Sequence, residues 1–297
     1  MPAGPYPEDW AAVHHVLDEG WMYILRFDDD LVSAGLLATP SGARRLGLGS
    51  GGDGANAWRT LLARYPSLAA QFEGSRPVFP VRLTGRVQHR LAHAAGARWV
   101  LLPHSYAFVD PLFSTGIAWS LLAVERLAEA FGTGGGQGPR PAALRQYDAQ
   151  LSAEADQIDR MVAGAYVAMA DFALFAAHTM LYFAVVSFAE TRLRLVPGAR
   201  PGGMLGAGEP AIEEAYRESL RRLRRLTGGG RHVANVAGRR GFADWVARTI
   251  APWNVAGLAD PWRRNLYPVD LDVLVERSHL LGLTPEDVRR ALPRLRS

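Results

Sequence analysis

A polar stretch between two apolar segments holds the residue types best suited to chemistry in this 297-residue chain. Asp110, Ser114 and Thr115 are helix-capping types, and an apolar helix is expected to begin directly after them. Pro111 and Gly116 shape the backbone at the same point. The free amides of a helix N-terminus favour a phosphate, a halide or the electron-rich edge of a flavin ring. An ordinary capped helix after a buried strand is the alternative, and spacing alone leaves both open.

The histidines do not form a convincing metal site. His14 and His15 are neighbours on an expected strand, where side chains point to opposite faces. His89 and His93 have a chelating i, i+4 spacing, but no nearby acidic residue completes a ligand set. We therefore predict no metal. His178, inside an apolar helix, is either a hydrogen-bonded core residue or part of a substrate cavity.

Composition removes several reaction classes. The chain has no cysteine, which excludes disulfides, thiolate metal sites and cysteine nucleophiles. All 33 basic residues are arginine, so Schiff-base chemistry and a P-loop lysine are excluded too. A net charge of +4 is too small to argue for nucleic acid as a partner. With 48% hydrophobic and 21% charged residues, the composition is that of a globular protein.

An expected helix over Pro210–Leu226 contains a local basic cluster after three glutamates. Its arginines are Arg217, Arg221, Arg222, Arg224 and Arg225. We interpret the cluster as the solvated face of an amphipathic helix. A helix that docks on nucleic acid, anionic lipid or an acidic protein is the alternative, so the role of the cluster stays open.

The pattern of elements predicts an α+β fold. Apolar runs at Val13–Leu17, Gly20–Phe27 and Leu31–Ala38, separated by acidic turns, predict an antiparallel meander. Further elements are expected as a helix at Ala57–Phe72, strands at Val78–Val87 and Trp99–Leu102, and a helix at Ile117–Phe131. From Ala142 the pattern is helical almost to the end. A Gly/Pro segment at residues 132–141 therefore predicts two domains, 1–131 and 142–297.

The helical region includes one segment of membrane-span length. Phe172–Ala189 contains no formal charge over 18 residues, the lower end of that length. Its central His178 and Thr179, and the absence of an aromatic belt, favour a central buried helix and no membrane span. Aromatic residues between Tyr166 and Phe188 are interpreted as core packing, with a cavity lining as the alternative. The N-terminus lacks the features of a secretory signal, so a cytoplasmic location is expected.

Two motifs resemble those of flavin-dependent halogenases and related FAD monooxygenases. Phe108–Ile117, with the helix that follows it, is similar to the second FAD-contact motif of that family. Val13–Phe27, with Ser33–Gly35, is similar to its substrate-side meander. The resemblance covers roughly residues 6 to 195 and corresponds to the C-terminal half or more of a full-length member.

The resemblance implies a fold of the p-hydroxybenzoate hydroxylase type. This chain would supply the antiparallel substrate sheet, the last strand and helix of the FAD-binding domain, and a mostly helical C-terminal region. The implied chemistry is the reaction of reduced FAD with O₂, followed by hydroxylation or halide oxidation. The resemblance leaves open which of the two occurs, which small organic substrate is used, and the oligomeric state.

The resemblance also assigns site residues, although no catalytic residue is identified. FAD contact falls on Asp110, Pro111, Ser114, Thr115 and Gly116. The substrate cavity falls on Trp21, Tyr23, Phe113 and His178. A halide would bind the backbone amides of Thr115 and Gly116.

Departures from the family pattern limit what carries over. The strand–GxGxxG–helix unit that holds the ADP part of FAD has no counterpart, because the match at Gly47–Gly52 follows no apolar strand. Pro103 and His104 replace the Gly-Asp pair that usually contacts the flavin ribityl and pyrophosphate groups, so FAD is expected to be weakly bound or lost. Of the W-x-W-x-I-P signature, the chain keeps the first tryptophan, Trp21.

These observations favour an FAD-dependent oxidoreductase that is N-terminally incomplete or degenerate. Its expected partners are a missing N-terminal half or a reductase. The alternative is a non-catalytic accessory protein that keeps the cavity without the cofactor. An in-frame GxGxxG coding stretch upstream of Met1 would distinguish an incomplete chain from a short protein.

Chlorination of free tryptophan is not expected from this chain. Phe113 stands where tryptophan halogenases have a glutamate that supports proton removal from the indole, and a phenyl ring accepts no proton. The catalytic lysine of the halogenases is also absent. Incubation with reduced FAD, chloride and tryptophan should give no chlorotryptophan by mass spectrometry. A chlorotryptophan signal above a protein-free control would contradict this prediction.

Overall fold

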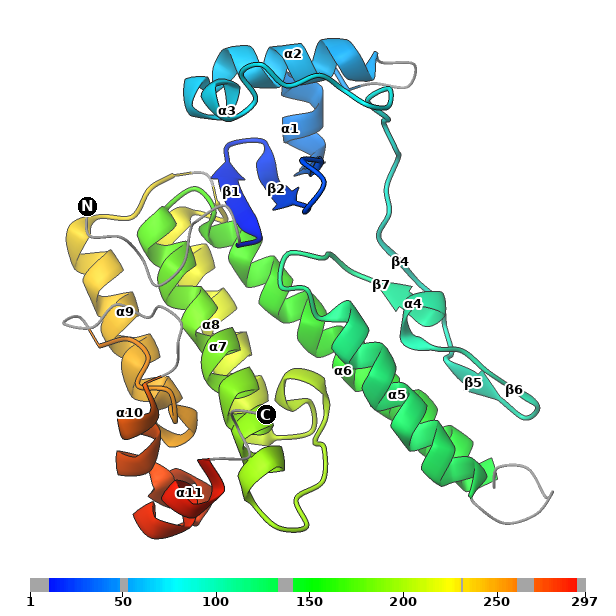
Figure 1. Ribbon diagram of the computed structural model, residues 1–297, viewed down its shortest axis with the longest axis vertical. Helices are drawn as coiled ribbons and strands as arrows, with labels where there is room; N and C mark the ends of the chain where they lie inside the picture. Colours follow the sequence, from blue (N-terminus) through cyan, green and yellow to red (C-terminus); the bar gives the residue numbers. More distant parts are fainter. Residues whose placement is uncertain (1–10, 49–52, 133–140, 231, 261–269, 293–297) are drawn as a thin grey trace. The chain divides into compact units, whose positions relative to one another are not determined.

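The computed structural model describes residues 11–48, 53–132, 141–230, 232–260 and 270–292. The chain separates into two compact units, Met1–Val87 and Gln88–Ser297. Helices and small antiparallel sheets occur together, as the α+β prediction expected (Figure 1).

The first unit contains the predicted meander. Strands β1 (Val13–Leu17), β2 (Gly20–Arg26) and β3 (Val32–Ala38) pair antiparallel in that order. Leu17 pairs with Gly20, so a two-residue turn joins the first two strands. The observed strand ends agree with the prediction to within one residue, because period-2 alternation and acidic turns both mark them.

Three short helices cover one face of this sheet. They are α1 (Pro40–Arg45), α2 (Gly54–Arg64) and α3 (Pro66–Gln71). Met22 on β2 packs with Leu46, Leu61 and Leu68 in a buried cluster. The single helix expected over residues 57–72 is interrupted before Pro66, because proline lacks an amide donor and disfavours helical geometry at the preceding residue.

The strand expected at Val78–Val87 is wrong. Val78 and Phe79 are 61% and 77% exposed, and no strand pairs with this segment among the described residues. A strand needs a partner for its amides and a surface for its apolar side chains. Val78 and Phe79 lie on the surface, without the apolar cover that a strand of this composition needs.

The second unit begins with four two-residue strands, which are β4 (His89–Arg90), β5 (Ala95–Gly96), β6 (Trp99–Val100) and β7 (Ala107–Phe108). β4 pairs with β7 and β5 with β6, both antiparallel. The strand expected at Trp99–Leu102 is thus shorter, because Pro103 starts the one-turn helix α4 (Pro103–Tyr106). Helix α5 (Gly116–Phe131) follows, in agreement with the prediction for residues 117–131.

Four long helices form the body of this unit. They are α6 (Pro141–Ala168), α7 (Phe172–Leu195), α8 (Pro210–Thr227) and α9 (Val236–Ile250). Figure 1 shows α7 and α8 side by side, with α9 next to them, and α6 packs on both α7 and α8. The 3₁₀ turns η2 (Met204–Gly206) and η3 (Ala251–Trp253) contact α7.

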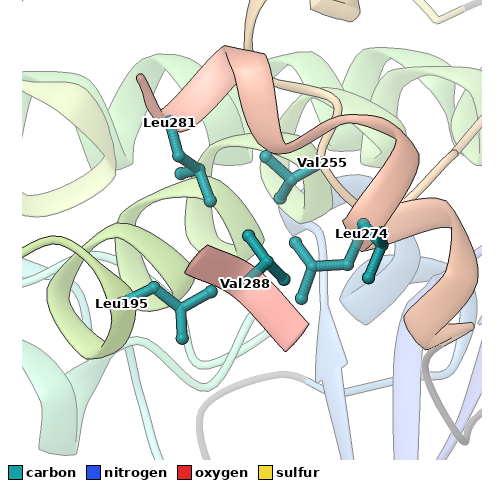
Figure 2. Close-up of a cluster of buried hydrophobic side chains, with 6 residues drawn as sticks. Leu195, Val255, Leu274, Leu281 and Val288 are labelled. Carbon is teal, nitrogen blue, oxygen red and sulfur yellow. The ribbon is translucent and has the colours of Figure 1, made fainter. Parts of the chain in front are cut away.

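The C-terminal elements close one end of α7. They are α10 (Leu271–Glu276), η4 (Ser278–Leu281) and α11 (Pro285–Ala291). Their buried side chains form one cluster with the end of α7 (Figure 2), which contains Leu195, Val255, Leu274, Leu281 and Val288.

The boundary between the units differs from the expected one at residues 132–141, of which 133–140 lie outside the described residues. Helix α5 precedes that segment yet packs on α6 beyond it. Trp119 and Arg126 of α5 both bond to Glu154 of α6. The Gly/Pro segment therefore joins two helices of one unit rather than two domains.

Helix α7 is long and apolar enough to cross a membrane by length and composition. In the structure it packs on α6, α8 and α9. One third of its most apolar 18-residue stretch is buried, and the buried-helix interpretation stays a prediction.

His178 is fully buried in this helical packing. Its Nδ1 lies 2.8 Å from Ser219 Oγ and its Nε2 lies 2.9 Å from the Met161 carbonyl oxygen. A Cβ at Gly164 would collide with the ring. Burial away from water lowers the pKa of His178 to about 4.

This burial predicts a specific loss of stability in acid. The folded-state pKa lies below the ordinary value of 6.5, so the unfolded chain binds the proton first. The stability is complete above that value and falls as the pH drops toward 4. We expect a loss of about 2 kcal/mol by about pH 5, absent in His178→Gln, which cannot titrate. Urea unfolding of both proteins at several pH values measures the difference, and equal losses would contradict it.

Candidate functional site

A cavity of about 250 Å³ lies at the start of α5. All five residues that the sequence resemblance assigned to FAD contact line it: Asp110, Pro111, Ser114, Thr115 and Gly116. Phe108, Ile117 and Ile158 supply apolar parts of the wall. The structure thus brings the turn before α5 together with the adjoining face of α6.

Asp110 shapes the turn rather than capping α5. Its Oδ1 accepts a hydrogen bond from the Leu112 amide at 2.9 Å, an Asx turn. Its Oδ2 accepts one from the Tyr166 hydroxyl on α6 at 2.8 Å. The N-cap residue of α5 is Thr115, whose side chain makes no capping hydrogen bond. Of the three capping types in the sequence, Thr115 thus occupies the N-cap position, but its side chain does not cap the helix.

Thr115 and Gly116 line the cavity, and their amides precede the first helical hydrogen bond of α5. Ser114 has a φ of 51°, in the left-handed region, and its amide donates to the Pro111 carbonyl oxygen at 2.8 Å. The first helical bond of α5 runs from the Trp119 amide to the Thr115 oxygen. Among the described residues no acceptor is bonded to the amides of Thr115 and Gly116. The turn is therefore not packed shut, as a purely structural cap would be.

His104 lies at the same wall. Its ring rests on the backbone of Gly116, where a Cβ would collide with it. Its Nδ1 is 3.4 Å from Ser120 Oγ, and its ring centroid is 6.0 Å from that of Phe108. Two amide donors, an imidazole and apolar walls suit a planar ligand with an electron-rich edge.

Comparisons with known proteins show which family the residues around this site are similar to. Residues 82–172, which include the whole turn, match the tryptophan halogenase family. Monodechloroaminopyrrolnitrin halogenase PrnC from Pseudomonas fluorescens is 30% identical over 122 residues, which are 39% of this chain and 21% of PrnC. Tetracycline 7-halogenase from Kitasatospora aureofaciens is 28% identical over 138 residues, 41% of this chain and 24% of that enzyme. The chain is related to the flavin-dependent halogenases.

Solved halogenase structures share the fold of this halogenase-like chain. The crystal structure of halogenase PltM in complex with phloroglucinol and FAD aligns with a TM-score of 0.65 and 18% identity. The alignment covers 89% of this chain and 54% of PltM. A second PltM structure aligns with a TM-score of 0.64 and 19% identity, over 83% of this chain and 52% of PltM. The chain spans about half the length of PltM and a quarter or less of the curated halogenases it matches.

The four residues assigned to a substrate cavity divide between the two units. Trp21 and Tyr23 lie on β2 in the first unit, with ring centroids 6.3 Å apart. Phe113 and His178 lie in the second unit, and neither lines the cavity at α5. Phe113 is buried against Tyr182, with ring centroids 4.9 Å apart. The structure thus gives Phe113 and His178 packing roles, the alternative that the sequence had left open for the histidine.

The arginine cluster of α8 is paired along its own helix. Arg217 bonds to Glu213 at 2.8 Å, and both Arg221 and Arg222 bond to Glu218. Exposed pairs of this kind contribute only about 0.2–1 kcal/mol each. The five arginines outnumber the three glutamates, so the pairing does not neutralise the cluster, and the solvated-face interpretation stays a prediction.

Helix α5 also presents an apolar stripe next to the site. The α5 stripe consists of Ile117, Leu121, Val124 and Phe131, which are 76%, 64%, 48% and 49% exposed. Side chains three, four and seven positions apart lie on one helix face. Trp99, on the strand that precedes the turn, is 49% exposed as well. Uncovered apolar surface was expected at these two elements if part of the site comes from elsewhere.

The left-handed Ser114 gives a direct test of the turn. A β-branched side chain is strongly disfavoured at positive φ, whereas glycine is not. Ser114→Val should lower the free energy of unfolding by about 1–2 kcal/mol. Ser114→Gly is the matched control and should stay within about 0.5 kcal/mol of wild type, since the side chain is exposed. Urea denaturation measures both, and two equally stable variants would argue against this turn.

Proposed function

We propose that this chain forms the flavin-ring and substrate portion of an FAD-dependent, halogenase-like oxidoreductase. The observation that supports this most is the cavity at α5, with the open amides of Thr115 and Gly116 beside apolar walls. The relatives named above are halogenases, and PltM has been solved with FAD. In this chain the two amides would hold the electron-rich edge of the ring, with Asp110, Pro111 and Ser114 completing the turn.

The donor set and the size of the cavity fit the ring of FAD rather than the whole cofactor. A volume of about 250 Å³ lies just below the usual range of roughly 300–1,000 Å³ for small-molecule sites. Among the described residues no strand leads into a glycine-rich turn and helix. Gly47 follows α1 rather than a strand, and residues 49–52 of the GxGxxG match lie outside the described residues.

The ADP portion of FAD therefore needs a binding site outside this cavity. We assign it to a dinucleotide-binding unit that the described residues do not contain. The α5 stripe is the surface such a unit would cover, because the stripe begins at Ile117, which also lines the cavity. In this sense the chain is an incomplete member of its family.

Reduced FAD, when bound, supplies the reaction with O₂ in this class of oxidoreductase. The chain's own residues would position the flavin ring and the substrate and shield them from water. Phe108 and Ile117 exclude water from part of the wall, and the carboxylate of Asp110 is spent on the turn and on Tyr166. The imidazole of His104 offers a hydrogen-bonding group at this wall. Phe113 accepts none, which disfavours tryptophan as the substrate.

The remaining parts of the proposal follow from the class of reaction. A small organic molecule is the substrate, with a halide at Thr115 and Gly116 if the product is halogenated. A reductase supplies the reduced flavin, and the location is cytoplasmic. The accessory-protein alternative shares the fold but predicts no flavin affinity.

Flavin titrations test the proposal. The purified chain should lose FAD during gel filtration, because the ring alone contacts it. In fluorescence titrations riboflavin and FAD should bind weakly, with dissociation constants within about three-fold of each other. Ile117→Glu, which puts a charge at the cavity wall, should abolish binding. Leu121→Glu, one turn further along the same exposed face and outside the cavity, should not.

Two outcomes would contradict it. A yellow protein with stoichiometric FAD after gel filtration would show that this chain holds the whole cofactor. No riboflavin binding by the wild-type chain would favour the accessory-protein alternative.

A further inference from the structure

The turn before α5 is fixed partly from outside, because no side-chain hydrogen bond caps the helix. Thr115 makes no capping hydrogen bond, and Ser114 is in the left-handed region. A helix that begins with unbonded amides and a strained residue is stable only when neighbouring groups fix its backbone. Two tyrosines of the helical body do this.

Tyr166 of α6 holds the first residue of the turn. Its hydroxyl donates to Asp110 Oδ2 at 2.8 Å. The other carboxylate oxygen accepts the Leu112 amide at 2.9 Å. A single carboxylate therefore links α6 to the backbone of the turn, and hydrogen bonds to a carboxylate are among the stronger ones.

Tyr182 of α7 holds the other end. Its hydroxyl donates to the Phe113 carbonyl oxygen at 2.9 Å. Its ring also packs on the Phe113 ring, with centroids 4.9 Å apart. This carbonyl belongs to the residue directly before Ser114, so its direction determines the peptide that enters the left-handed position.

We propose that Tyr166 and Tyr182 are positioning residues for the flavin-facing turn. Their hydroxyls take the place of a capping side chain, which leaves the amides of Thr115 and Gly116 unspent and directed at the cavity. This inference rests on the proposed function for its ligand, the flavin ring. The positioning itself is a property of the protein alone.

Variants that each lack one tyrosine hydroxyl separate the positioning of the turn from its link to the flavin ring. Tyr166→Phe and Tyr182→Phe keep the rings and remove the bonds to the turn. Tyr147→Phe is the matched control, because its hydroxyl donates to the Leu101 carbonyl oxygen at 2.8 Å, outside the turn. Urea unfolding of all three establishes that they fold and that the control loses a comparable bond.

The first readout needs no flavin. In the wild type the amides of Leu112 and Ser114 are hydrogen-bonded within the turn. NMR-detected hydrogen exchange at these two amides should accelerate about five-fold or more in Tyr166→Phe and Tyr182→Phe. It should not change in Tyr147→Phe. Unchanged exchange in both turn variants would overturn the positioning role.

The second readout is the riboflavin dissociation constant. It should rise about five-fold or more in both turn variants, the equivalent of one lost hydrogen bond, and stay at the wild-type value in the control. Faster exchange with an unchanged dissociation constant would overturn the link to the cofactor. If the wild-type chain binds no riboflavin while exchange still accelerates, the proposed function fails and the positioning of the turn stands.

Discussion

The buried carboxylate of Glu154 determines how α5 lies on the rest of its unit. A fully buried carboxylate costs several kcal/mol unless it is paired and hydrogen-bonded. Glu154 accepts the Trp119 indole N–H at 2.8 Å, the Arg126 guanidinium at 2.7 Å and the Met204 amide at 2.8 Å. Trp119 and Arg126 both belong to α5, so satisfying this one charge selects the face of α5 that meets α6. The position of the turn at the start of the helix follows from it.

The same constraint accounts for the α5 stripe. A surface helix usually buries its apolar face and exposes its polar one. In α5 the need to pair Glu154 places an indole N–H and a guanidinium on the inner side. Ile117, Leu121 and Val124 are left outside. An apolar face beside an open cavity is the kind of surface that marks an interaction site, and here both features result from one buried charge.

Local patterns predicted the elements better than they predicted the site. Alternation and acidic turns predicted the meander, and apolar residues at helical spacing predicted the helix before residue 132 and the helical region after it, because these signals act over a few residues. The segment Val78–Val87 has a strand-like composition but forms no strand in the structure, which no local pattern reveals. Asp110 is a capping type, yet its oxygens are used by Leu112 and Tyr166. Glu154 looks like any glutamate on an amphipathic helix, since its partners lie far along the chain. The hydroxyls of the half-buried Tyr166 and Tyr182 were the signal that the aromatic run does more than pack.

The helical body after residue 141 is therefore part of the site rather than a cover for it. Two of its tyrosines hold the turn, Tyr166 through Asp110 and Tyr182 through the Phe113 carbonyl, whereas Tyr147 donates to the Leu101 carbonyl outside the turn. Burial raises the pKa of Tyr147 to about 12, so this hydroxyl keeps its proton and stays a donor over the whole physiological range. A main-chain carbonyl oxygen accepts a hydrogen bond whatever the side chain of its residue. The long helices can therefore fix the backbone path of the segment before α5 without determining its side chains. The amides at the start of α5 are then free for a ligand, because the bonds that hold the backbone are all made elsewhere.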